Sequence, residues 1–342
     1  MRKILIILLA LLLPALLTPV LLIGQGGNTL QTVQARGKLV CGVNSGVPGF
    51  GFLGPDGTFS GFDTDYCRAL AAAIFADPTK VEFVPLTAKE RFTALQTGEI
   101  DVLIRNTTWT FVRDTEVGTN FAPTTFYDGQ GFLVRKDSGI TSIDDLDGAT
   151  ICVLSGTTTE LNLADEFRKR GLSFTPVVFD ETNAVYEAYE AGRCDAATSD
   201  KSQLAARRLA LSNPDDHVIL PETISKEPLG PVVRHGDDQW FDLVKWTVNC
   251  TIQAEEFGID STNVESFFGS GDPKIARLLG DEGDLGQRAF GLDNRWCANV
   301  IKLVGNYGEL YEKNLTPLGL KREGSPNALW TNGGLLYSPP FR

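Results

Sequence analysis

The chain has 342 residues, enough for two packed domains, and 31 Lys and Arg against 43 Asp and Glu give it a formal charge of -12. No nucleic-acid partner is expected, because proteins that bind phosphate backbones are basic. A content of 42% hydrophobic and 22% charged residues is ordinary for a globular protein and excludes a disordered chain. His217 and His235 are the only histidines, so we expect neither a histidine-rich metal site nor a Ser-His-Asp triad, and no cofactor.

The N-terminus has the pattern of a secretory signal. Arg2 and Lys3 precede an apolar run over residues 4–23 that two prolines interrupt, and a polar stretch of small residues follows. We therefore assign residues 1–27 to a signal peptide and expect an exported, periplasmic protein. The apolar run is also just long enough to span a bilayer, so an uncleaved N-terminal membrane anchor is the alternative.

The first predicted elements alternate between strand and helix. A strand over 37–44 leads through a turn rich in Gly and Pro to a helix over 63–75. A strand over 80–84, a helix over 88–96 and a strand over 100–104 complete a βαβαβ unit. Such a unit indicates a mostly parallel sheet.

The same pattern returns later in the chain. Its strands and helices are expected over residues 149–154, 159–169, 173–179, 184–191 and 195–198. Each unit places a glycine at a helix end and an aspartate before a buried strand, Gly98 with Asp101 and Gly192 with Asp195. Two similar α/β lobes are therefore favoured over a single sheet.

Two short extended segments could join these lobes. Phe132–Arg135 and Gly230–Arg234 are expected to cross side by side as a hinge. The first lobe then takes residues 37–133, the second takes 134–232, and 233–342 returns to the first lobe as a C-terminal extension. The predicted fold class is α/β, a two-lobed clamp with mixed, mostly parallel sheets and a two-strand hinge.

Several short motifs, each weak alone, follow one another along the chain. They lie at residues 61–68, 91–101, 105–113, 126–131, 156–161 and 226–230. In their order and coverage, the chain from Lys38 to Leu310 resembles the periplasmic solute-binding proteins of polar amino-acid ABC transporters, within the general L-amino-acid-binding branch. The resemblance implies a type II periplasmic-binding-protein clamp, working as a monomer. It would capture free L-amino acids with broad specificity and deliver them to the membrane permease of an ABC transporter.

A free amino acid presents a carboxylate and an ammonium on one carbon, so its site needs a cation, neutral donors and a counter-anion. In the first lobe, candidate residues follow a strand end, where open parallel sheets bind ligands. The resemblance implies that Arg113 holds the α-carboxylate and that Asn106 and Thr108 each supply a donor. The alternative for Arg113 is a surface arginine paired with Asp114 or Glu116.

The second lobe offers Thr157 and Thr158 at the start of a helix, where backbone N–H groups favour an anion. An ordinary Thr N-cap is the other interpretation, and both roles can hold together. Asp200 follows the third strand of this lobe and resembles the family's acid that pairs with the α-ammonium. Its alternative is a cap for a helix over 201–211.

Aromatic side chains could cover the ligand. The candidates are Phe50, Phe52 and Tyr127, although aromatics are more often part of the core. Charge-specific members of the family present an aromatic before the first-lobe proline, where this chain has Gly46-Val-Pro48. That departure leaves the side-chain selectivity open. Both histidines stand in polar stretches and are expected on the surface.

The cysteine count is even, which in an exported chain favours disulfides, and the sequence alone allows about 15 pairings of six cysteines. The predicted topology narrows this, because a helix packs over the strand before it and the first and third strands of such a unit are neighbours. The expected pairs are Cys41–Cys67, Cys152–Cys194 and Cys250–Cys297. None crosses the hinge, so the lobes stay free to move; the alternative is one or more reduced, buried pairs.

A second class of function uses the same clamp, because a fold does not fix a function. A small-molecule lyase or dehydratase would need an acid or base facing the pocket, for which Glu160 and Asp128 are candidates. No second converging acid-base pair can be found in the sequence. We therefore expect a binding protein without catalytic residues.

Overall fold

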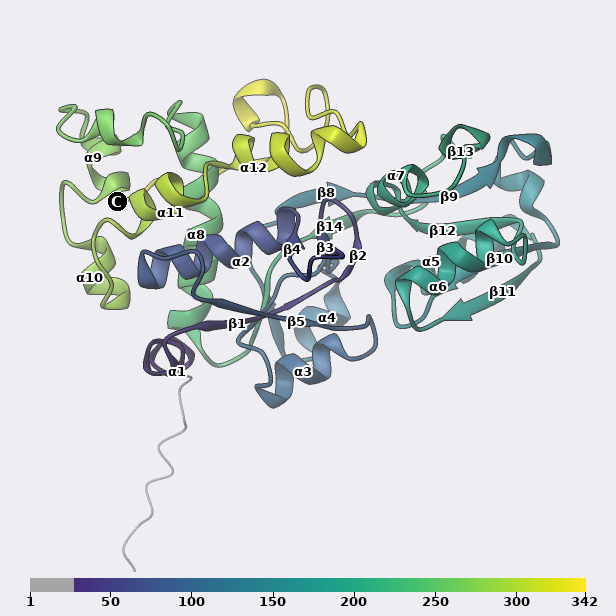
Figure 1. Cartoon of the computed structure of the whole chain (residues 1–342), viewed down its shortest axis with the longest axis horizontal. Coiled ribbons are helices and arrows are strands. Elements are labelled where there is room, and N and C mark those ends of the chain that lie inside the picture. Colours follow the sequence, from purple (N-terminus) through teal and green to yellow (C-terminus); the bar gives the residue numbers. More distant parts are fainter. Residues whose placement is uncertain (1–27) are drawn as a thin grey trace, which may run out of the picture.

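The computed structural model describes residues 28–342, so the expected signal peptide lies outside the described residues. In this stretch, no helix is both long and apolar enough to cross a membrane. Figure 1 shows a larger lobe at the left and a smaller one at the right, with thin connections between them. The expected two-lobed α/β clamp is confirmed.

The larger lobe contains a five-stranded sheet in the order β5-β1-β6-β15-β7. Its strands are β1 (Leu39–Val43), β5 (Val81–Pro85), β6 (Val102–Leu103), β7 (Thr119–Phe121) and β15 (Val232–Arg234). Strands β5, β1 and β6 are parallel, connected by α2 (Phe62–Phe75) and α3 (Arg91–Thr97), while β15 runs antiparallel. The lobe also holds α1 (Thr29–Arg36), α4 (Phe111–Thr115), β2 (Gly46–Val47), β3 (Gly51–Leu53) and β4 (Phe59–Ser60). The predicted βαβαβ unit is therefore present.

The smaller lobe repeats this arrangement in the order β11-β10-β12-β9-β13. Its strands are β9 (Gln130–Arg135), β10 (Ala149–Leu154), β11 (Phe174–Phe179), β12 (Ala196–Asp200) and β13 (His217–Ile219). Its helices are α5 (Thr158–Arg170), α6 (Thr182–Glu190) and α7 (Lys201–Leu209). In both sheets the first strand of the unit lies between the second and third, and a strand from outside the unit pairs antiparallel with the third. The repeat seen in the sequence is therefore a repeat of structure.

The two segments predicted to form the two-strand hinge do not pair with each other. β9 belongs to the smaller lobe's sheet, between β12 and β13, and β15 belongs to the larger lobe's sheet. The strands that cross together are β8 (Phe126–Asp128) and β14 (Glu227–Leu229), paired antiparallel. Phe132–Arg135 and Gly230–Arg234 lie in buried, apolar strands. Strands of this kind belong in the interior of a sheet more often than in an exposed connection between lobes. The strands of the smaller lobe's sheet lie between Gln130 and Ile219, and β8 and β14 form a separate two-stranded sheet.

The C-terminal residues add a layer of helices to the larger lobe, as Figure 1 shows. They are α8 (Asp238–Glu256), α9 (Pro273–Leu279), α10 (Leu285–Phe290), α11 (Trp296–Leu303) and α12 (Tyr307–Asn314). α8, α11 and α12 pack against α2, so their apolar faces join the core of this lobe. The tail then reaches a hinge strand, where the Asn327 amide bonds both the N–H and the C=O of Tyr127, at 2.7 and 3.0 Å.

The cysteine pairing predicted from topology is confirmed. The disulfides are Cys41–Cys67, Cys152–Cys194 and Cys250–Cys297, with Cα atoms 6.2, 5.6 and 5.8 Å apart. The first two tie β1 to α2 and β10 to the residues before β12, and the third ties α8 to α11. Each bridge lies within one lobe, so none restrains movement about the hinge.

One of the two histidines is not on the surface. His217 begins β13 and is buried, and its Nδ1 lies 2.8 Å from the hydroxyl of Tyr189. Pairing of β13 with the inner strand β9 draws this residue inward, which the polar sequence around it did not indicate. Burial lowers the pKa of His217. His235 is exposed, as expected.

Candidate functional site

Five of the predicted ligand residues meet at one small cavity between the lobes. Asn106 and Thr108 reach it from the larger lobe, and Thr157, Thr158 and Asp200 from the smaller one. Asp200 is the last residue of β12, and the other four follow the ends of β6 and β10. The other residues of its wall are Arg91, Arg105, Leu154, Thr159, Ser199 and Gln203. The sequence motifs thus bring donors and an acid from both lobes to one place.

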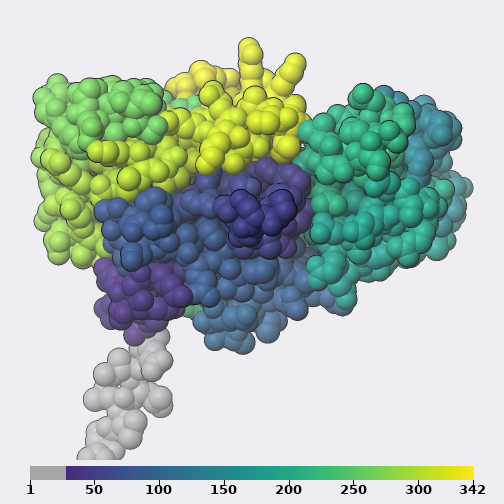
Figure 2. All heavy atoms as spheres, viewed as in Figure 1, coloured from purple at the N-terminus to yellow at the C-terminus, as the bar shows by residue number. Residues whose placement is uncertain are grey.

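The clamp is closed around this cavity. Two polar contacts cross it, from Asn106 Nδ2 to Gln203 Oε1 at 3.3 Å and between the Thr108 and Thr158 hydroxyls at 3.4 Å. Figure 2 shows the teal surface of the smaller lobe abutting the larger lobe. The cavity has a volume of about 20 Å³, room for about one water molecule. An amino acid therefore needs the lobes to separate before it can enter.

Asn106 has a strained backbone at the centre of the site. Its φ of +31° lies in the left-handed region, which residues other than glycine seldom adopt. Its N–H donates to Asp63 Oδ2 at 2.6 Å, and its side-chain oxygen accepts from Asn44 at 3.2 Å. Such strain persists where the surroundings impose it, and it is common at binding sites.

Arg113 is buried, and no ion pair to Asp114 or Glu116 occurs within residues 28–342, so the surface-arginine alternative does not hold. Its backbone N–H is capped by the Thr110 hydroxyl, and its Nη1 donates to the carbonyl of Thr108 at 2.9 Å. It does not itself line the closed cavity, but it is bonded to a residue that does. Burial lowers the pKa of Arg113, and the charges of Glu227 and Asp200 act against that.

Asp200 is only 6% exposed and stands at the N-cap of α7 without making a side-chain cap bond. The helix-cap alternative is therefore not what the structure shows. Burial raises the pKa of Asp200 well above its usual range, and the neighbouring carboxyls of Asp128 and Glu227 add to this. Arg91 and Arg113 oppose the shift. A ligand ammonium is the kind of partner that would favour ionised Asp200.

The two threonines have different roles. Thr157 is the N-cap of α5, accepting from Glu160 N at 3.2 Å and donating to Leu154 O at 2.6 Å, so its cap alternative is confirmed. Thr158 faces the other lobe and donates at 2.9 Å to Glu227, a buried residue of hinge strand β14. Thr158 therefore couples the helix start to the hinge.

Arg91 and Arg105 complete the wall, although sequence reasoning did not single them out. Arg91 begins α3 on the same face as the buried Ala94 and Leu95, and its Nε has no hydrogen-bond partner in the described chain. Burial, then the charges of Arg113 and Arg105, lower the pKa of Arg91 well below its usual value. In the sequence, Arg91 falls three and four residues before Ala94 and Leu95, on the apolar face of the predicted helix, and this position could have identified it as a buried arginine.

The expected aromatic cover is absent from this cavity. Phe50 is a core residue, packed edge-on against Phe62 and Phe126 at centroid distances of 6.4 and 5.3 Å. Phe52 lies in the small sheet of β2, β3 and β4, and Tyr127 lies in hinge strand β8. The general preference of aromatics for the core explains Phe50.

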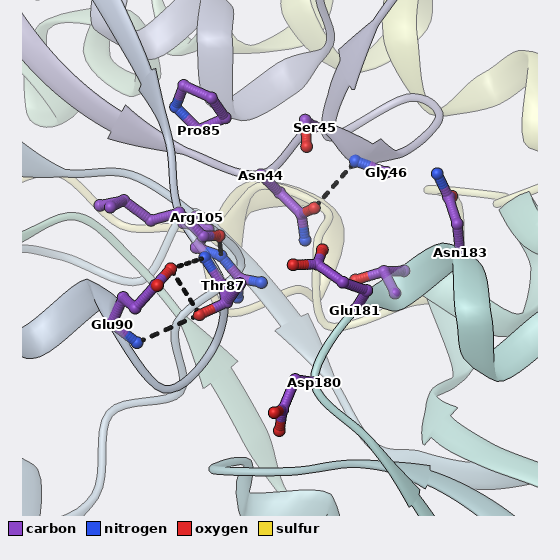
Figure 3. A pocket seen from close by; sticks show the side chains of 12 residues that line it. Asn44, Ser45, Gly46, Pro85, Thr87, Glu90, Arg105, Asp180, Glu181 and Asn183 are labelled. Carbon is purple, nitrogen blue, oxygen red and sulfur yellow. Dashed lines mark hydrogen bonds between the residues drawn. The ribbon is translucent and has the colours of Figure 1, made fainter.

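A second, larger cavity lies beside the first, with a volume of about 280 Å³ (Figure 3). The two adjoin at Arg105, which lines both, and through the bond between Asn44 and Asn106. The lining residues are Asn44, Ser45, Gly46, Pro85, Leu86, Thr87, Glu90, Arg105, Asp180, Glu181, Thr182 and Asn183. Both lobes therefore contribute to this space.

The acids proposed for a lyase serve the local structure. Glu160 accepts from the N–H of Gly156 at 2.9 Å, and Asp128 accepts from the N–H groups of Gly129 and Ser202 at 2.8 and 3.3 Å. Burial raises the pKa of Asp128 to about 6. Across residues 28–342 there is also no group of His, Cys, Asp and Glu arranged to hold a metal ion. The lyase alternative has no support from this geometry.

Comparison with known proteins identifies the family. Residues 39–258 match the family model of bacterial extracellular solute-binding proteins, family 3. The chain is 57% identical to the general L-amino acid-binding periplasmic protein AapJ of Rhizobium johnstonii, over 92% of this chain and 93% of that protein. It is 51% identical to the glutamate/glutamine/aspartate/asparagine-binding protein BztA of Rhodobacter capsulatus, over 92% and 94%.

A solved structure agrees. The ABC transporter periplasmic binding protein from Brucella ovis, with glutathione bound, has a TM-score of 0.89 and 55% identity, covering 92% of this chain and all of that one. The chain therefore belongs to the bacterial extracellular solute-binding proteins of family 3. The resemblance drawn from the sequence motifs is confirmed.

Proposed function

We propose that this protein is a periplasmic receptor that captures free L-amino acids and delivers them to the permease of an ABC transporter. One observation carries the proposal. A buried aspartate of the smaller lobe, Asp200, lines the interlobe cavity, and a buried arginine of the larger lobe, Arg113, bonds the carbonyl of Thr108 in its wall. Neither forms an ion pair with another side chain of residues 28–342. A zwitterion between them would supply both missing partners.

Binding follows from this placement. With the lobes apart, the ligand α-carboxylate meets the guanidinium of Arg113, and Asn106 and Thr108 donate to it from the same loop. Closure then brings Asp200 to the α-ammonium and Thr158 at the start of α5 to the carboxylate. Because the two ionic contacts come from different lobes, the ligand favours the closed clamp. The permease can then distinguish a loaded receptor from an empty one by its shape.

This account predicts breadth of specificity. The contacts assigned above recognise only the α-carboxylate and α-ammonium of the ligand. Gly46 has no side chain at the position where charge-specific members of the family place an aromatic that distinguishes ligand side chains. Several chemically different L-amino acids, including L-alanine, L-glutamine and L-glutamate, should therefore compete for one site with comparable affinity. Competition against a radiolabelled amino acid measures this, with D-enantiomers as controls. A strict preference for one charge class would contradict broad specificity but leave the transport role intact.

A further inference from the structure

The second cavity between the lobes is large, polar and adjacent to the place assigned to the amino acid. Its volume of about 280 Å³ contrasts with about 20 Å³ for the first cavity. It remains open in a clamp whose lobes already touch, for Lys89 Nζ lies 3.0 Å from Asp180 Oδ1 and Arg207 Nη1 donates to Gly46 O at 3.0 Å. Closure of the lobes therefore does not remove this space.

Arg105 stands at the junction of the two cavities. It is only 3% exposed, and its one side-chain hydrogen bond to the described residues runs from Nε to the carbonyl of Leu86 at 2.8 Å. Its two Nη groups are therefore left to donate into the cavities that it lines. Burial lowers the pKa of Arg105 to about 10, so the guanidinium stays charged at neutral pH.

An acceptor faces this donor across the cavity. Glu181 precedes α6 and lines the space, and its carboxylate accepts no hydrogen bond from any of residues 28–342. Arg105 and Glu181 line the same cavity, and the negative charge of Glu181 raises the pKa of Arg105 against the effect of burial. In Figure 3, Asn44, Arg105 and Glu181 point toward the same space. The other acids of the wall are engaged, Glu90 with Thr87 and Asp180 with Lys89 and Ser155.

A cationic donor opposite a carboxylate acceptor fits a secondary amide, which needs a donor for its C=O and an acceptor for its N–H. A second carboxylate on the ligand would satisfy Arg105 but would meet the like charge of Glu181. We propose that this cavity is a tail compartment for amino acids whose side chain continues through an amide, with γ-glutamyl amides as the ligand class. The proposal rests on the proposed function, because the α-amino acid head must occupy the site of Arg113 and Asp200.

The test compares a short ligand with an extended one by calorimetry on the mature chain. L-Alanine reports on the head site, and γ-L-glutamyl-ethylamide reports on head and tail together. The wild type should bind both. Thr87→Trp, which fills the compartment, should weaken γ-L-glutamyl-ethylamide by at least 30-fold and L-alanine by less than threefold. The matched control Thr87→Val loses the hydroxyl bonds to Glu90 without adding bulk, and it should change either affinity by less than threefold.

A second variant tests the polar contact. Glu181→Ala removes a side chain that caps no helix, and it should weaken γ-L-glutamyl-ethylamide about tenfold while leaving L-alanine unchanged. If the wild type binds L-alanine but not the amide, or if Thr87→Trp weakens both ligands equally, the tail compartment is refuted and the receptor function stands. If no L-amino acid binds at all, the proposed function itself fails.

Discussion

Replacing Arg113 by lysine should weaken amino-acid binding by at least tenfold, about 1.4 kcal/mol. Lysine keeps the charge but loses the planar fork, which bonds a carboxylate with two parallel N–H groups. It also loses the rigid bond from Nη1 to the Thr108 carbonyl, which fixes where the charge lies. Isothermal titration with L-glutamine measures the loss.

The control for this prediction is Arg168→Lys, the same substitution at an exposed position of α5, where the arginine pairs with Asp165. It should leave the affinity unchanged, since exposed pairs contribute little. Thermal unfolding of both variants without ligand shows whether the fold is preserved. A folded Arg113→Lys protein that binds as tightly as the wild type would remove Arg113 from the site.

Truncating Asp200 should be more costly, because the ammonium of the ligand would be left buried without its partner. We expect Asp200→Ala to lose about 2 to 5 kcal/mol of binding free energy. Asp200→Asn should lose affinity too, yet it should unfold at a higher temperature than the wild type in the absence of ligand. A carboxyl whose pKa is raised in the folded protein destabilises the fold when ionised, so the neutral amide relieves that cost at neutral pH.

The same carboxyl predicts a dependence on pH. The ligand ammonium favours ionised Asp200, whereas burial and the charges of Asp128 and Glu227 favour the protonated form in the empty clamp. Binding should therefore release protons, and affinity should fall as the pH is lowered through the raised pKa of Asp200. Calorimetry in two buffers of different ionisation heat counts these protons, and Asp200→Asn should abolish the release. Proton uptake by the wild type would exclude this role.

Much of this architecture could be predicted from the sequence, because alternating apolar runs and glycine-capped helices define both βαβαβ units. The cysteine pairs followed from that topology. The hinge strands could not be found in this way, because β8 and β14 are short and half-polar and have no clear strand pattern. Phe132–Arg135 is more apolar and was therefore easier to recognise as a strand. Which lobe a strand joins depends on sheet pairing over long range, which local patterns do not encode.

At the site, residues that follow strand ends were found because their position has a physical reason. Arg91 was missed although it lies on the apolar face of α3. Arg105 was missed because a buried arginine in a loop looks like an exposed one until its neighbours are known. Phe50 was named as a candidate ligand contact only because it is aromatic. Aromatic residues lie in the core more often than in a binding site, and Phe50 does so. The larger cavity could not be predicted either, because residues of both lobes form it. At Gly46, for example, an added Cβ would lie 3.2 Å from atoms of Thr182 and Asn183 in the other lobe.

A crystal structure of the mature protein with L-glutamine tests the central claim most directly. The account predicts one ligand between the lobes, with its α-carboxylate oxygens within hydrogen-bond distance of the Arg113 guanidinium and of Asn106 or Thr108. Its ammonium should lie against a carboxylate oxygen of Asp200 from the opposite lobe. A ligand bound outside this interlobe site, or bound there with its carboxylate and ammonium away from Arg113 and Asp200, would contradict the account.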